Sequence, residues 1–92
     1  MEFTDEDRKR FNDTLSKLIG NAQEATDAAK AELAKTNDIS HHVALKATSA
    51  VGEVTGFTRA FDVVGIEVPG ELAGRVATLA EDWNGVIIRR GR

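Results

Sequence analysis

The side chains best suited to chemistry in this sequence are two adjacent histidines, His41 and His42. An imidazole can bind a metal ion or transfer a proton near neutral pH. Adjacent residues on a helix point about 100° apart, whereas chelation of one metal ion needs side chains that converge. We therefore expect two solvated histidines and no metal site.

Two acidic clusters could in principle supply metal ligands or acid–base groups. The first, Asp5-Glu6-Asp7, lacks the alternating spacing and the glycine of a calcium loop, and the positive end of a helix dipole explains it. The second, Glu81-Asp82, precedes Trp83 without a candidate nucleophile nearby. Because the chain has no cysteine and no glycine-rich phosphate loop, the sequence predicts no catalytic residue, no metal ion and no cofactor.

The C-terminal segment offers a candidate contact surface. Val86, Ile87 and Ile88 form a β-branched run that Arg89 and Arg90 follow directly. We expect an extended tail over residues 86–92. Such a tail either covers the end of the core beside Trp83, or adds to the sheet edge of a partner while its arginines bind an acidic surface.

A second candidate surface is the small-residue stripe, defined as Gly52, Gly56 and Ala60, which lie four residues apart on one helix face. A glycine inside a helix lowers the stability by about 1 kcal/mol relative to alanine, so the presence of two glycines needs an explanation. Close packing against the first helix, or an interruption of the helix near Gly52, is one explanation. A contact face for a partner helix is the other.

The elements that must position these residues are helices. Thr4 is a suitable N-cap, and apolar residues then recur at steps of three and four, with Leu33 one place off that register. Pro69 suits the first turn of a later helix, and Asn84-Gly85 suits a left-handed helix end. The pattern predicts three helices, over about residues 5–35, 39–64 and 69–84. With short loops between them, the sequence predicts one all-α domain over residues 1–92, a three-helix up-down-up bundle.

The helix lengths differ enough to predict an asymmetric core. At 1.5 Å per residue the three helices would be roughly 46, 39 and 24 Å long, so the third cannot cover the hairpin of the other two. Large apolar residues gather at one end of that hairpin: Phe11, Leu15, Leu18, Ile19, Val54, Phe57, Phe61 and Val64. Alanines dominate the other end. We therefore expect a core at one end and a long, alanine-rich hairpin that projects from it beside a shorter third helix.

Composition bears on the kind of partner. The formal net charge is −3, and neither half of the chain is basic, so nucleic acid is an unfavourable partner. No apolar run approaches the roughly 18 residues of a membrane span, and we expect no membrane partner. The absence of cysteine suits a cytoplasmic protein.

We therefore expect a non-enzymatic helical protein–protein interaction module: an adaptor, inhibitor or regulatory protein, with a phage-encoded protein among the candidates. Its expected partner is another protein or a second copy of itself, and a homodimer is the simplest assembly. The alternative is a helix-turn-helix-like DNA-binding regulator, because residues 65–69 join two helices by a short glycine-containing turn. The helix after that turn carries Arg75 as the only base in its opening, which weakens the alternative.

Overall fold

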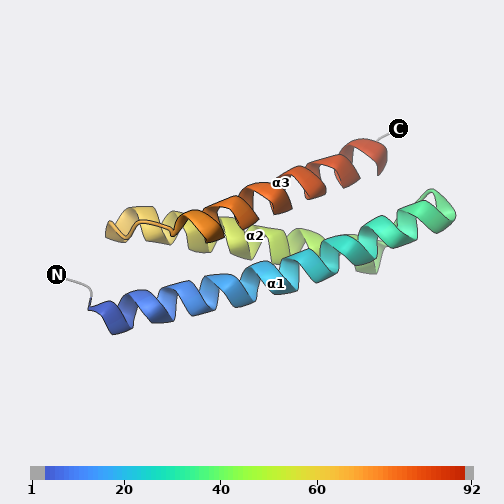
Figure 1. The fold of residues 1–92 in the computed structure, drawn as a ribbon. Coiled ribbons are helices and arrows are strands. Elements are labelled where there is room, and N and C mark those ends of the chain that lie inside the picture. The colour runs from blue at the N-terminus through green and yellow to red at the C-terminus, as the bar shows by residue number, and fades with distance from the viewer. Residues whose placement is uncertain (1–3, 91–92) are drawn as a thin grey trace.

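The fold consists of three α-helices that run up, down and up. The computed structural model describes residues 4–90, and of Arg89 and Arg90 only the backbone. The helices are α1 (Asp5–Thr36), α2 (His41–Val64) and α3 (Gly70–Arg90), as Figure 1 shows. The described residues contain no strand. The predicted all-α three-helix bundle, with its third helix the shortest, is confirmed.

Local hydrogen bonds define both ends of α1. The Thr4 hydroxyl accepts from the Asp7 amide at 3.1 Å, and the Asp7 carboxylate accepts from the Thr4 amide at 3.1 Å. At the other end Asn37 adopts the left-handed conformation, with φ of 60°, and its amide donates to the Leu33 carbonyl. The Glu32 carboxylate then accepts from the Ser40 amide at 2.7 Å and fixes the loop before α2.

The second loop stops α2 and starts α3 within five residues. Gly65 has φ of 78°, which glycine adopts without steric cost, and it forms the C-cap of α2. The Pro69 carbonyl accepts from the Ala73 amide at 2.9 Å, so the hydrogen bonding of α3 begins directly at the proline. The predicted boundaries at this loop and at both ends of α1 hold to within two residues.

The predicted end of the third helix is wrong. Helix α3 continues through Asn84 and Gly85 to Arg90, and neither residue has a positive φ. The cause is burial: Val86 is 3% exposed and extends the seven-residue spacing of the buried Leu72 and Leu79. Burying that side chain outweighs the roughly 1 kcal/mol that a glycine costs inside a helix. Residues 86–90 are therefore helical and not an extended tail, while residues 91–92 lie outside the described part.

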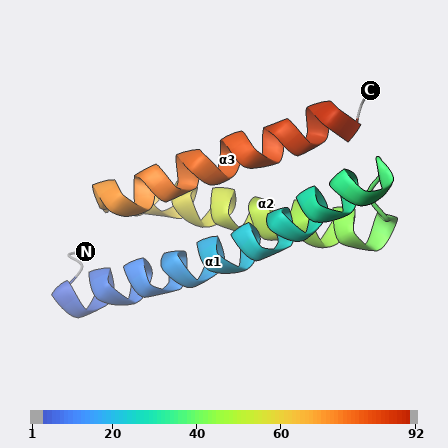
Figure 2. The ribbon, with the colours of Figure 1, turned by 45° about the vertical axis from the view of Figure 1, so that its right-hand side comes forward.

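Helix α1 is the central element. It contacts both α2 and α3 along its length, whereas α2 and α3 contact one another little. Figure 2 shows α3 running alongside α1 and diverging from α2 with distance from the loop that joins α2 to α3. The Cα atoms extend over 50 × 19 × 18 Å, so the bundle is elongated. Its stability rests on the two faces that α1 presents to its neighbours.

The core has two parts. The first cluster lies toward the α2–α3 loop, where the Phe11 ring packs on Phe57 and Phe61 with centroid distances of 5.6 and 5.2 Å. The second cluster lies toward the α1–α2 loop, where Val86 and Trp83 of α3 pack against the hairpin. The buried members of the first are Leu15, Ile19, Ala22, Val54, Phe61, Ile66, Leu72 and Leu79, and those of the second are Ala29, Leu33, Ile39, Ala44 and Val86. The prediction that the core gathers at one end and the alanine-rich hairpin projects from it is therefore wrong, because the longer α3 covers the other end as well.

Candidate protein-interaction surface

The small-residue stripe lies on the outside of α2. Gly52 and Gly56 are exposed and Ala60 is half-buried. A methyl group added at either glycine would meet no atom within 4 Å, and α2 runs without interruption. Neither close packing against α1 nor a helix break therefore explains the glycines. Leu45 and Val63, which are 54% and 85% exposed, share this outer face at heptad spacing from Gly52 and Gly56.

The residues of the predicted tail divide between core and surface. Val86 packs in the second cluster, and that burial removes it from any surface that a partner could contact. Ile87 and Ile88 are 49% and 57% exposed on the last turn of α3. The backbones of Arg89 and Arg90 continue the helix, and their side chains lie outside the described part. The isoleucines of α3 and the small-residue stripe of α2 belong to helices that contact one another little.

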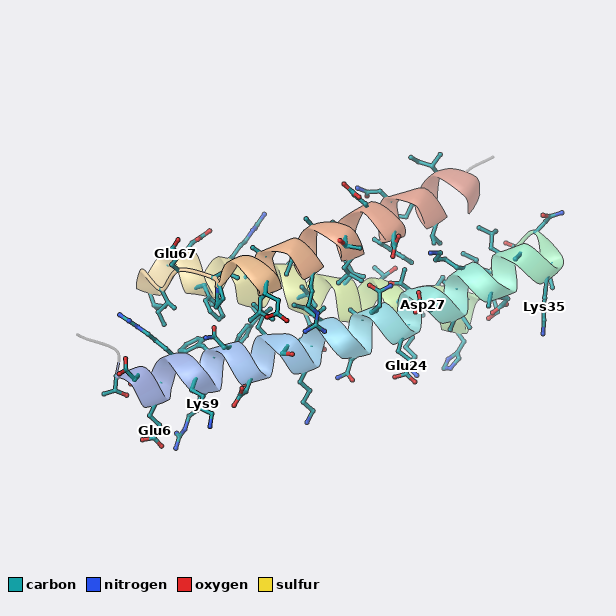
Figure 3. All side chains as sticks on the ribbon, viewed as in Figure 1. Glu6, Lys9, Glu24, Asp27, Lys35 and Glu67 are labelled. Atoms are coloured by element: carbon teal, nitrogen blue, oxygen red, sulfur yellow. The ribbon has the colours of Figure 1, made fainter. Side chains whose placement is uncertain are left out.

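The structure reveals a groove that the sequence analysis missed. It lies between α1 and α2, has a volume of about 410 Å³ and is lined by residues of these two helices. Ala25, Ala28, Val43 and Ala50 supply its apolar part, and Asn21, Glu24, His42 and Lys46 supply polar groups. Figure 3 shows Glu24 pointing away from α3. We call this surface the hairpin groove.

Polar contacts between α1 and α3 flank their apolar packing. Asp82 of α3 accepts from the Gln23 amide at 3.2 Å and lies 3.8 Å from the Lys30 ammonium. The Arg75 guanidinium donates to the Ser16 hydroxyl at 3.0 Å. Asp82, an acid of the predicted Glu81-Asp82 cluster, and Arg75, the base of the DNA-binding alternative, thus both attach α3 to α1.

The remaining candidate groups form no further site in the part of the chain that is described. His42 lines the hairpin groove, and His41 does not. Within residues 4–88 no group of three or more histidine, aspartate or glutamate side chains is placed to hold a metal ion. None of the helices as described is long and apolar enough to cross a membrane.

The alanines that line the hairpin groove are visible in the sequence, but they belong to two different helices. Alanines recur on both, and only the rotation of α1 and α2 about their axes decides which alanines meet. That rotation is fixed by the packing of α1 against both α2 and α3, which periodicity alone does not give. Comparison of the chain with protein families, with curated proteins and with solved structures finds no match.

Proposed function

We propose that this chain is a non-enzymatic helical protein–protein interaction module that self-associates through its α1–α2 hairpin. The observation that supports this proposal is the hairpin groove, whose alanine lining allows a further helix to approach closely. Burial of apolar surface contributes roughly 25 cal/mol per Å² to association. A helix that approaches the hairpin groove closely would therefore bury apolar surface that the α1–α2 hairpin leaves exposed, and this burial would stabilise the complex.

The small size of the domain supports the same proposal. A chain of this length buries only about 60–65% of its unfolded surface, so a partner adds stability that the core alone lacks. Five large apolar side chains also remain exposed: Leu45, Val63, Val64, Ile87 and Ile88. We propose an adaptor, inhibitor or regulatory protein of the cytoplasm, with a phage as one candidate source.

The solution mass tests the proposal directly. We expect light scattering on a sizing column to give twice the chain mass of 9.9 kDa at high concentration, with a shift toward the monomer on dilution. Circular dichroism of each fraction would show that helix content is retained. A mass of one chain at every concentration, with helix content intact, would contradict self-association.

A further inference from the structure

We infer that the occupant of the hairpin groove is a second copy of this chain, held by ion pairs between Lys17, Glu24, Lys46 and Glu53 of the two copies. The inference rests on the proposed self-association and identifies the face that carries it. It follows from three observations on these four residues: their spacing, their level along the helices and the order of their signs.

The spacing places each pair of charges on one side of its helix. Lys17 and Glu24 are seven residues apart on α1, and Lys46 and Glu53 are seven residues apart on α2. Seven residues make nearly two helical turns, so each pair projects in about the same direction. Glu24 and Lys46 line the hairpin groove from its two walls, and Lys17 and Glu53 are exposed one heptad away.

The contacts within the hairpin place the charges at matching levels. Phe11 of α1 packs on Phe57 and Phe61 of α2. Counting from these contacts along the antiparallel helices, Lys17 comes level with Glu53. Glu24 comes level with Lys46, in agreement with their shared position on the groove. The two levels are about 10 Å apart at 1.5 Å per residue.

The signs of the four charges make the surface self-complementary. The α1 wall carries a cation and then an anion, while at the same levels the α2 wall carries an anion and then a cation. None of the four takes part in an ion pair in the described part of the chain, where the pairs are Arg10–Glu6 and Lys30–Asp82. A second hairpin laid on the first therefore brings opposite charges together, with the alanines between them.

Two twofold arrangements satisfy this pattern, and they pair different residues. With the axis parallel to the helices, α1 lies beside the partner's α2, and Lys17 meets Glu53 while Glu24 meets Lys46. With the axis across the helices, α1 lies beside the partner's α1, and Lys17 meets Glu24 while Lys46 meets Glu53. In both arrangements every charge of the set gains an opposite neighbour from the other copy.

Charge reversal at one position tests the pairing. We expect Lys46→Glu to raise the dimer dissociation constant on the order of tenfold, because two attractive pairs become repulsive by symmetry. Arg59→Glu is the matched control. It makes the same charge change at an exposed position of α2, one heptad from Gly52 on the outer face. We expect the control to change the dissociation constant by less than about threefold.

Double reversals then identify the axis. Restoration of the wild-type dissociation constant by Glu24→Lys with Lys46→Glu supports the inference with the parallel axis. Mixing the two single variants should then also form a heterodimer. Restoration by Lys17→Glu with Glu24→Lys supports the inference with the axis across the helices. Failure of both double variants to restore the dimer, with helix content intact, would overturn it.

A variant of the outer face separates this inference from the proposed function. A methyl group at Gly52 meets open space, so Gly52→Leu should remain folded and dimeric if the hairpin groove is the interface. If Gly52→Leu dissociates the dimer and Lys46→Glu does not, the outer face of α2 carries the association. In that case the inference fails and self-association stands. A monomeric wild-type chain at all concentrations contradicts both.

Discussion

Thr26 is the one polar residue among the buried residues of the described part, with no exposed surface. Its hydroxyl oxygen has no hydrogen-bond partner there. The hydroxyls of Thr48 and Thr58, by contrast, donate to the carbonyls of Ala44 and Val54, each at 2.8 Å. A buried hydroxyl without a partner costs about 1–3 kcal/mol, so Thr26 lowers the stability of the core.

Replacement of Thr26 by valine should therefore stabilise the protein. Valine keeps the β-branched shape and removes the unpaired hydroxyl, so we expect the free energy of unfolding to rise by about 1 kcal/mol. Urea unfolding followed by circular dichroism measures the change. Thr58→Val is the control, because it removes a hydroxyl that is bonded and should leave stability unchanged or slightly lower. A lower free energy of unfolding for Thr26→Val would show that the Thr26 hydroxyl has a hydrogen-bond partner in the folded protein.

Residue-level chemistry was predictable where the interaction is local. The Thr4 cap and the left-handed Gly65 depend on residues within three or four positions of each, and the sequence indicated a helix boundary at both. Gly85 shows the opposite case. The pair Asn84-Gly85 suits a helix end. Val86, however, packs against residues about forty to sixty positions away in the chain, and that packing extends the helix.

At the scale of the elements, α1 buries a wider stripe than the single seam that the sequence predicted. Ala25 is buried and Leu18 packs against the first cluster, as the pattern indicated, but Leu33, which the pattern left outside the seam, is buried as well. A row that the pattern did not indicate runs at alternating steps of four and three: Leu15, Ile19, Ala22, Thr26, Ala29 and Leu33. The polar Thr26 concealed this row. Because α1 also packs against two helices, it buries a wider stripe than one seam provides.

The extension of α3 makes a prediction about two neighbouring side chains. Val86→Ala should lower the free energy of unfolding by roughly 1–3 kcal/mol, because it removes buried methyl groups from the second cluster. Ile88→Ala should change it by less than about 0.5 kcal/mol, because Ile88 is exposed. Chemical unfolding followed by Trp83 fluorescence measures both. Equal effects of the two variants would argue against a helical segment at residues 86–90.

At the scale of the whole molecule, the order and direction of the helices were predictable, because short loops force consecutive helices to run antiparallel. The hairpin groove and the second cluster were not. Both depend on how far α3 reaches and how α1 is rotated, and these are set by clusters that bring together distant residues such as Ile39 and Val86. The five exposed apolar side chains likewise became recognisable only once the core was known.

The two clusters should differ in local stability. The second contains two alanines among its five buried residues and includes the last turns of α1 and α3. We expect amide hydrogens of Leu33 and Val86 to exchange at least about tenfold faster than those of Ile19 and Leu79. Hydrogen exchange followed by nuclear magnetic resonance measures each amide. Uniform protection across the two clusters would instead indicate that the bundle opens only as a unit.

An odd number of antiparallel helices sends the two ends of the chain in opposite directions. Figure 1 places the start of α1 and the end of α3 at opposite ends of a molecule 50 Å long. Any segment joined before residue 4 and any segment joined after residue 90 would therefore leave from opposite poles. The module would then keep two tethered groups about one bundle length apart. A helical hairpin alone would hold both groups at the same end.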